Sequence, residues 1–428
     1  MLLVVLFAYK IDIWVFNIFK QLNYGFGPSH LKVFFVRITD LGDSLWYFAI
    51  FILIYLFSYF MKITNLIGLE KYLYLKKFSV FSFVYLLLVG LITQLIKHLI
   101  GRPRPNHAQL DVGIEFNFFT TESAFHSFPS GHSSTIIAVT IIVALALPNL
   151  RYFFYLCGFL IALSRVVVEA HFLTDVFGGV LIAIIVYKFL DYFVKTKYPR
   201  IYWGELVFQK ISPLTKILIV FFVLAIFVTV GPEIDVFISS LFYYGNDQFL
   251  LQSYYFVSIL FREFLLPAIL VYVFFLPFFI KFFPIQKIYF GYKFSFSEII
   301  FLWFSGAITM LLIVNVLLKN MWGRVRPNDV SYFGGFQDFT PWYKISNICA
   351  SNCSFVSGDS SVGFLLIVFY FITKKNAYLY LGLILGSLLG FIRIAAGGHF
   401  FSDIIFSQIV VTVTILVSFV LYKKFYDK

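Results

Sequence analysis

The sequence predicts an all-α polytopic membrane protein built as two tandem helical bundles of five to six transmembrane helices each. Of its 428 residues, 61% are hydrophobic and only 13% are charged, a composition typical of membrane proteins. Many apolar segments reach the roughly 20 residues that a helix needs to cross a bilayer. In addition, one ordered set of polar residues occurs in the first half and again in the second half.

The first half is expected to contain five spans within a domain that covers residues 1–195. Residues 1–9 are apolar but too short to cross a bilayer, and residues 11–20 are expected to form an interfacial helix. The predicted spans follow at 46–61, 78–96, 132–147, 153–168 and 172–190.

The second half, residues 214–428, is expected to place one span before its own interfacial helix at 234–243. Its predicted spans lie at 217–230, 255–280, 296–318, 360–373, 378–394 and 401–422. Between the halves, residues 188–216 contain six Lys or Arg and two acidic residues. The sequence therefore predicts a basic cytoplasmic linker at 196–213.

The formal net charge of +12 is spread over several loops. Because no single soluble segment gathers these cations, the charge argues against nucleic-acid binding. Loops rich in Lys and Arg lie on the cytoplasmic side of membrane proteins. With those loops inside, the C-terminus is expected in the cytoplasm, and the near-neutral polar stretches 101–131 and 323–358 are expected to face outward.

The polar set consists of an arginine, a histidine and an aspartate at fixed spacing. If Phe172 begins a helix, Asp175 lies about one turn from His171 on the same face. A carboxylate there can hold the imidazole by one ring nitrogen and leave the other free to attack. Arg165 would supply a forked donor for an oxyanion. The same spacing recurs at Arg393, His399 and Asp403, which indicates an internal duplication.

A second block consists of Lys97 at the end of a predicted span and Arg104 before Pro105, which stops any helix. A snorkelling lysine and a juxtamembrane arginine would account for one such instance. Lys319 and Arg326 repeat the spacing, also on the outer side, where cations are expected to be scarce. The recurrence favours an anion-binding role.

A third block, Ser130-Gly131-His132, opens the next predicted span. Ser-Gly is good helix-capping chemistry, but glycine also lets the backbone approach an anion, and a helix N-terminus presents free N–H groups to it. A cap alone does not need His132. The counterpart is Ser357-Gly358-Asp359, in which aspartate replaces the histidine.

Together the three blocks resemble the signature of the type 2 phosphatidic-acid phosphatase (PAP2) family, which vanadium haloperoxidases share. The resemblance implies a helical bundle with its site at the outer membrane face. The Ile-Asp-Ile-Trp and Leu-Gly-Asp-Ser-Leu-Trp-Tyr segments also resemble bacterial members, among them lipid A phosphatases. The expected location is therefore the bacterial inner membrane, with the sites facing the periplasm.

The resemblance implies that His171 attacks phosphorus and forms a phosphohistidine, with Asp175 orienting the imidazole. His132 would protonate the leaving lipid oxygen. The phosphoryl oxygens would be held by Lys97, Arg104, Ser130, Gly131 and Arg165. Because these cations supply the positive charge, neither a metal ion nor a cofactor is expected.

In the second half the corresponding catalytic residues are His399, Asp403 and Asp359. The corresponding phosphate-binding residues are Lys319, Arg326, Ser357, Gly358 and Arg393. Val356 and Asp359 depart from the family pattern, and Ile392 replaces the motif serine. Nearby cations would keep Asp359 ionised and make it a poor acid. The second site is thus either slow and limited to good leaving groups, such as a pyrophosphate or an anomeric sugar phosphate, or a degenerate structural copy.

The expected substrate is a membrane lipid with an outward-facing phosphate, of the lipid A, undecaprenyl pyrophosphate or phosphatidylglycerophosphate class. A lipid phosphotransferase is an alternative. A transporter is disfavoured because its charges usually lie near the bilayer midplane, whereas here they lie at helix ends. The expected partners are the lipid substrate and the bilayer, and no oligomeric state is predicted.

Two cysteines, Cys349 and Cys353, lie in the outward loop before Ser357. An oxidising compartment permits a disulfide between them, but spacing alone does not establish that the geometry closes. If formed, the bridge would brace the loop of the second site.

Overall fold

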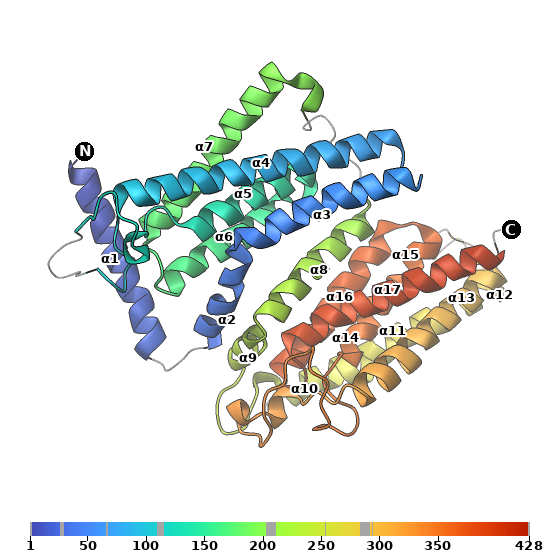
Figure 1. Ribbon diagram of the computed structural model, residues 1–428. Coiled ribbons are helices and arrows are strands. Elements are labelled where there is room, and N and C mark those ends of the chain that lie inside the picture. The colour runs from blue at the N-terminus through green and yellow to red at the C-terminus, as the bar shows by residue number, and fades with distance from the viewer. Residues whose placement is uncertain are drawn as a thin grey trace. The chain divides into compact units, whose positions relative to one another are not determined.

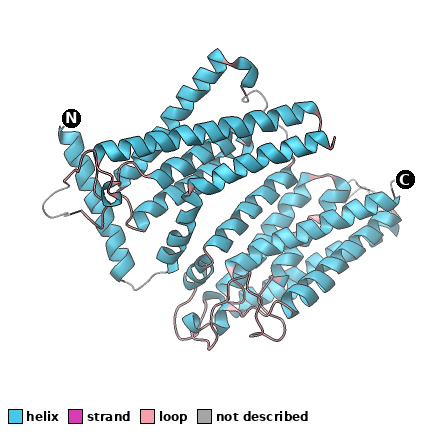
Figure 2. Cartoon of the chain, viewed as in Figure 1, coloured by secondary structure: helices cyan, strands magenta, loops and turns pink. Residues whose placement is uncertain are grey.

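The computed structural model describes residues 2–25, 30–65, 67–108, 115–202, 211–252, 254–282, 292 and 294–426. Within these ranges the chain is helical and contains no β-strand, only isolated bridges (Figure 2). It divides into two compact units, Met1–Ile211 and Ser212–Lys428. The prediction of an all-α protein with two tandem bundles is confirmed. Residues 203–210 of the predicted linker lie outside the described residues.

The helices of the first unit are labelled in Figure 1. In chain order its main elements are α1 (Leu2–Gly25), α2 (His30–Ile38), the 3-10 turn η1 (Thr39–Gly42), α3 (Ser44–Ile63), α4 (Leu69–Ile100), α5 (Gly131–Ala146), α6 (Arg151–Val167) and α7 (Leu173–Lys197). Helix α5 packs against α4, α6 and α7, so the segment that begins with Ser130 lies at the centre of the bundle.

The second unit repeats this plan with a more broken course (Figure 1). Its main elements are α8 (Pro213–Val230), α9 (Glu233–Ser240), α10 (Tyr255–Ile259), the π-helical η6 (Leu260–Leu265), α11 (Leu266–Phe274), α12 (Leu276–Phe282), α13 (Phe296–Ala307), the π-helical η8 (Ile308–Asn320), α14 (Gly358–Leu365), α15 (Val368–Thr373), α16 (Asn376–Ala395) and α17 (Phe401–Tyr426). Helix α14 takes the place of α5 and packs against α11, α16 and α17.

Eight described helices are long and apolar enough to cross a membrane, and the bent pair Leu260–Phe274 and Leu276–Phe282 is a ninth candidate. The two remaining predicted spans, 132–147 and 360–373, are apolar but short. Helix α5 has 16 residues, which rise about 24 Å, less than the roughly 30 Å of a bilayer core. These two helices fall short of full spans because they begin only at the Ser-Gly motif.

The N-terminal segment also differs from the prediction. Residues 1–9 and 11–20 were expected to be separate, but Leu2–Gly25 is one helix. Lys10 does not interrupt it because this residue is exposed on the helix surface. In the second unit the corresponding region does break, since Gly231-Pro232 separates α8 from α9.

Candidate active site

In each unit the ends of four helices bring the sequence-predicted residues together. In the first unit, Gly101 ends α4 in a left-handed conformation with φ of 59°, which suits a glycine C-cap. Lys97 lies in the last turn of α4, Arg104 lies in the loop that follows, and α5 begins at Gly131 with Ser130 as its N-cap. The end of α6 supplies Arg165, and the start of α7 supplies Asp175.

The histidine–aspartate pair lies at the start of α7, as the spacing predicts. His171 Nδ1 is 3.7 Å from Asp175 Oδ2, beyond hydrogen-bond range. Asp175 instead caps α7 by accepting from the backbone N–H of Phe172 at 2.8 Å. Ser127 donates to the same oxygen at 2.6 Å. The carboxylate therefore fixes the helix start that carries the imidazole.

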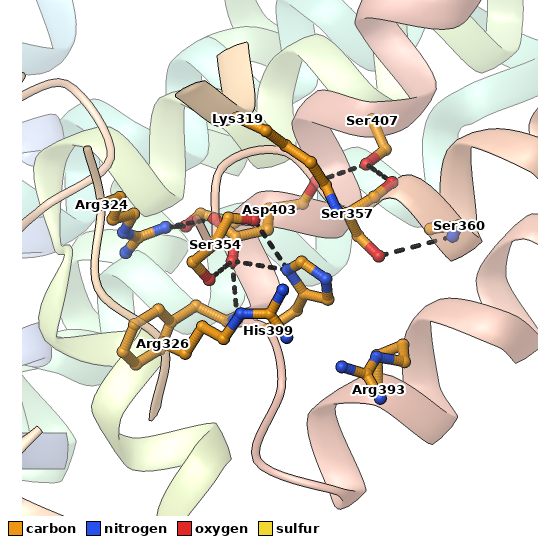
Figure 3. Close-up of polar contacts among 12 residues, drawn as sticks. Lys319, Arg324, Arg326, Ser354, Ser357, Ser360, Arg393, His399, Asp403 and Ser407 are labelled. Atoms are coloured by element: carbon orange, nitrogen blue, oxygen red, sulfur yellow. Dashed lines mark hydrogen bonds and ion pairs between the residues drawn. The ribbon is translucent and has the colours of Figure 1, made fainter. Parts of the chain in front are cut away.

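The second unit adds a direct contact to the imidazole. His399 Nδ1 donates to the Ser354 carbonyl at 2.7 Å and lies 3.5 Å from Asp403 Oδ2. Because a carbonyl only accepts, Nδ1 carries the proton and the lone pair is on Nε2. In Figure 3, Lys319, Arg326 and Arg393 lie around this ring.

Both imidazoles are almost fully buried, and burial sets their protonation. It lowers the pKa of His171 to about 4, although the neighbouring Asp175 carboxylate acts in the opposite direction. Burial likewise lowers the pKa of His399 to about 4 against the effect of Asp403. Each ring is therefore neutral at neutral pH, the form that a nucleophilic imidazole requires.

The three cations of the first unit are positioned by neutral oxygens. Lys97 Nζ donates to the His126 carbonyl at 2.5 Å, and Arg165 donates to the Thr39 hydroxyl at 2.8 Å. Arg104 Nε donates to a loop carbonyl at 3.2 Å. Within the described part of the chain, none of the three forms an ion pair with a carboxylate. Their charges interact with one another, so the cluster is suited to bind an anion.

At the N-termini of α5 and α14, a glycine leaves space between the helix backbone and a lysine side chain. Ser130 is the buried N-cap of α5, and its N–H donates to the Asp175 carbonyl at 2.9 Å. A Cβ at Gly131 would lie 3.8 Å from Lys97 Cε, and one at Gly358 would lie 3.1 Å from Lys319 Nζ. Each glycine therefore leaves a gap between a helix N-terminus and an ammonium group, the environment that an oxyanion prefers.

The residue after each glycine has a different neighbour in the two units. His132 packs against Gly42 of η1, where a Cβ would lie 2.9 Å from the His132 Cβ. Asp359 forms ion pairs with Arg262, at 3.3 Å, and with Arg393, at 3.4 Å. Arg393 thus contacts a carboxylate of its own unit, whereas Arg165 contacts a hydroxyl.

Sequence reasoning missed a buried arginine that joins the N-terminal helix to the site. Arg102 pairs with Asp175 at 2.5 Å and with Asp12 at 2.7 Å. Asp12 also accepts from the backbone N–H and the hydroxyl of Thr174, at 2.9 Å and 2.5 Å. We call Asp12, Arg102, Thr174 and Asp175 the carboxylate clamp.

The second unit contains the same clamp. Arg324 is fully buried and pairs with Asp403 at 2.5 Å and with Asp235 at 2.7 Å. Ser402 replaces the threonine and donates to Asp235 through its N–H and hydroxyl at 2.8 Å and 2.5 Å. The repeat could have revealed the clamp, because Asp12 and Asp235 lie in matching segments of the two halves.

The motif serine missing from the second half has a local role in the first. Ser164 donates to the Ile161 carbonyl of its own helix at 2.5 Å. Such a bond neither reaches the loop nor joins two helices. Its replacement by Ile392 therefore removes no hydrogen bond between the described residues of the site.

The loop of the second site contains a disulfide between Cys349 and Cys353, whose Cα atoms are 5.7 Å apart. Asn352, inside the bridged segment, accepts from Lys319 at 3.1 Å through its side chain and from Arg326 at 2.7 Å through its carbonyl. The bridge thus closes the turn that positions two of the cations.

Comparison with known proteins supports the duplication. The sequence model of the PAP2 superfamily matches residues 78–199 and 300–427. A lipid A 4'-phosphatase of Francisella tularensis subsp. novicida is 40% identical over 121 residues, which are 27% of this chain and 53% of that protein. A lipid A 1-phosphatase of Rhizobium etli is 34% identical over 155 residues, 36% of this chain and 66% of that protein.

A lipid A 1-phosphatase of Rhizobium johnstonii is 34% identical over 156 residues, 36% of this chain and 63% of that protein. The chain therefore spans between about half and two thirds of the length of these relatives. No solved structure matches the chain.

Proposed function

Because the chain belongs to the PAP2 superfamily, we propose that it is an integral membrane phosphatase that removes phosphate from an outward-facing lipid. The observation that carries the proposal is the neutral, buried imidazole of His171 near cations that donate to neutral oxygens. A nucleophile near a cluster of cations is what phosphoryl transfer needs. In this proposal residues 1–195 and 214–428 are two phosphatase units joined by a linker at 196–213.

The first half-reaction forms a phosphohistidine. His171 Nε2 attacks phosphorus, the bond from phosphorus to the lipid oxygen breaks, and the electron pair goes to that oxygen. The negative charge of the bound phosphate favours the protonated imidazole of His132. This imidazolium gives the oxygen its proton, so the lipid leaves as an alcohol. Asp175 and the carboxylate clamp keep the imidazole in place.

Water completes the reaction by attacking the phosphohistidine. His132, now lacking its proton, accepts one from the water, and inorganic phosphate leaves. Throughout, the phosphoryl oxygens are held by Lys97, Arg104, Arg165 and the N–H groups that follow Ser130. Preorganised charge of this kind stabilises the transition state more than the substrate.

The substrate is proposed to be a lipid of the inner membrane exposed to the periplasm, with lipid A, undecaprenyl pyrophosphate and phosphatidylglycerophosphate as the candidates. The relatives named as lipid A phosphatases support the first. The basic loops support a cytoplasmic C-terminus and therefore sites that face outward. Phosphate release from lipids added to sealed, oriented proteoliposomes tests this orientation.

A lipid panel tests the function. Purified protein is expected to release phosphate from at least one of the three lipids, and His171→Ala is expected to lower release from phosphate monoesters by about a thousandfold. The matched control is His107→Ala, an exposed histidine of the same loop, which should retain activity. Unchanged release after His171→Ala would contradict the proposed nucleophile.

A further inference from the structure

The two units differ at the position of the proton donor. His132 packs against Gly42, and the charges that act on it are those of Arg165 and Lys97 as well as that of Asp43. In the second unit the residue at this position is itself a carboxylate: Asp359 lies between the guanidinium groups of Arg262 and Arg393. Arg262 comes from the π-helical segment η6, which sequence reasoning did not connect with the site.

The replacement of histidine by a salt-bridged aspartate limits the chemistry of the second site. Asp359 is held as a carboxylate in ion pairs with two guanidinium groups, and a carboxylate has no proton to give. A lipid alkoxide cannot leave readily without a proton. A phosphate group that leaves from a pyrophosphate carries its charge without one. Arg262, whose side chain is 49% exposed, can move to meet that charge.

The cavities near His132 and near Asp359 also differ, in the polarity of their lining residues. In the second unit a cavity of about 690 Å³ reaches Val362, one turn after Asp359 on α14. The residues of α11, α13 and η8 that line it are apolar except for Asn315. In the first unit a cavity of about 370 Å³ beside His132 includes Asp43, Ser44 and Gln94. The cavity of the second unit suits a hydrocarbon that begins next to the phosphates. The cavity of the first unit suits a polar sugar or glycerol group.

We propose that the second site hydrolyses lipid pyrophosphates whose hydrocarbon is attached directly to the phosphates, while the first site hydrolyses phosphate monoesters. This proposal rests on the phosphatase function proposed above. Arg262 and Asp359 are the residues that determine the specificity, and the apolar groove of α11, α13 and η8 holds the hydrocarbon.

The reaction at the second site proceeds without a proton donor in its first step. His399 Nε2 attacks the terminal phosphorus, the bond to the bridging oxygen breaks, and the electron pair stays on the lipid monophosphate, which Arg262 stabilises. Water then attacks the phosphohistidine and gives its proton to Asp359, which passes it to solvent. The products are a lipid monophosphate and inorganic phosphate.

The first test silences the first site with His171→Ala and compares farnesyl diphosphate with farnesyl monophosphate. Phosphate release from the diphosphate is expected to persist and to disappear with added His399→Ala. Release from the monophosphate is expected to be about a hundredfold slower, the contribution of one general acid. Equal release from both compounds would overturn the proposal.

The proposed phosphatase function and the proposed division of substrates between the two sites are contradicted by different results. If wild-type protein hydrolyses the monophosphate and His171→Ala hydrolyses neither compound, the division of labour is wrong and the proposed phosphatase function stands. If folded wild-type protein hydrolyses no lipid phosphate at all, both are wrong.

Variants of Arg262 and Asp359, made in the His171→Ala protein, give a second test. Asp359→His combined with Arg262→Asp places an imidazole beside a carboxylate, as His132 has Asp43 near it, and should raise monophosphate release by at least about tenfold. Arg262→Ala alone should lower kcat/KM for the diphosphate, whereas Glu263→Ala, its exposed neighbour, should not. Failure of Arg262→Ala to affect the diphosphate would overturn the role of Arg262.

A third test addresses the groove. Ala307→Phe narrows the groove and should raise KM for farnesyl diphosphate by about tenfold, the effect of losing one or two buried methylene contacts. Hydrolysis of inorganic pyrophosphate, which has no hydrocarbon, should be unchanged. Leu312→Phe, on the same segment but outside the groove, is the control. An equal effect of Ala307→Phe on both compounds would show that the groove does not hold the hydrocarbon.

Discussion

At the scale of single residues, the carboxylate clamp explains how an ionised aspartate is kept beside a neutral histidine in a buried place. Arg102 forms two ion pairs: its Nη1 lies 2.5 Å from Asp175 Oδ1, and its Nη2 lies 2.7 Å from Asp12 Oδ2. A buried charge is costly unless it is paired and hydrogen-bonded. Because Asp175 also caps α7 through Phe172, a shift of the clamp would move the imidazole.

Asp12→Asn tests the clamp, because it removes one charge and keeps the shape. We expect a stability loss of roughly 3 kcal/mol, the cost of breaking a buried pair, seen as a lower melting temperature in detergent. We also expect lower kcat for monoester hydrolysis with little change in KM, since the phosphate cations are untouched.

The matched control is Asp235→Asn, which breaks the same contact in the second unit. It should cause a similar loss of stability and leave monoester hydrolysis intact. Equal loss of monoester activity in both variants would mean that the effect is global unfolding and not misplacement of His171.

At the scale of elements, the site depends on the close approach of α5 and α7. A Cβ at Gly179 of α7 would lie 2.6 Å from the Ser130 carbonyl and 2.9 Å from the Ser134 nitrogen. Both atoms are backbone at the start of α5, so they cannot rotate away. Gly179 therefore allows the contact through which the Ser130 N–H reaches the Asp175 carbonyl.

Gly179→Ala is expected to separate the two helix starts and to lower monoester hydrolysis by about a hundredfold, the penalty for a misplacement near 1 Å. The control is Gly68→Ala at the N-cap of α4, where a Cβ meets nothing within 4 Å. That variant should lower stability by no more than about 1 kcal/mol and leave monoester hydrolysis intact. The test is to measure monoester hydrolysis and melting curves of Gly179→Ala and of its control variant. Full activity in Gly179→Ala would contradict the packing argument.

At the scale of the whole molecule, the duplication made much of the architecture predictable. Nine of the predicted spans coincide with candidate membrane helices, since apolar length alone identifies them. The fixed spacing of His171 and Asp175 predicted their position at a helix start. The partners of Arg102 could not be predicted from one half alone, because its contacts join Asp12 to residues far along the chain; only the matching positions of Asp12 and Asp235 pointed to them. The role of Arg262 was also hidden, since it depends on how η6 packs against α14.

The disulfide gives the two units different sensitivities to reduction. Asn352, which holds Lys319 and Arg326, lies between Cys349 and Cys353, whereas in the first unit the lysine is held by the His126 carbonyl in a loop without cysteine. Reduction loosens only the second turn, and misplaced phosphate ligands cost about tenfold to a hundredfold in rate.

We therefore expect Cys349→Ser with Cys353→Ser, or treatment with dithiothreitol, to lower release of phosphate from farnesyl diphosphate in the His171→Ala protein. Monoester hydrolysis in the His399→Ala protein should be unaffected, because its cations lie in the other unit. Cys157→Ser, at the free cysteine, controls for loss of a thiol. If dithiothreitol slowed both reactions equally, the bridge would act on the whole fold, and the two loops would not be independent supports of two sites.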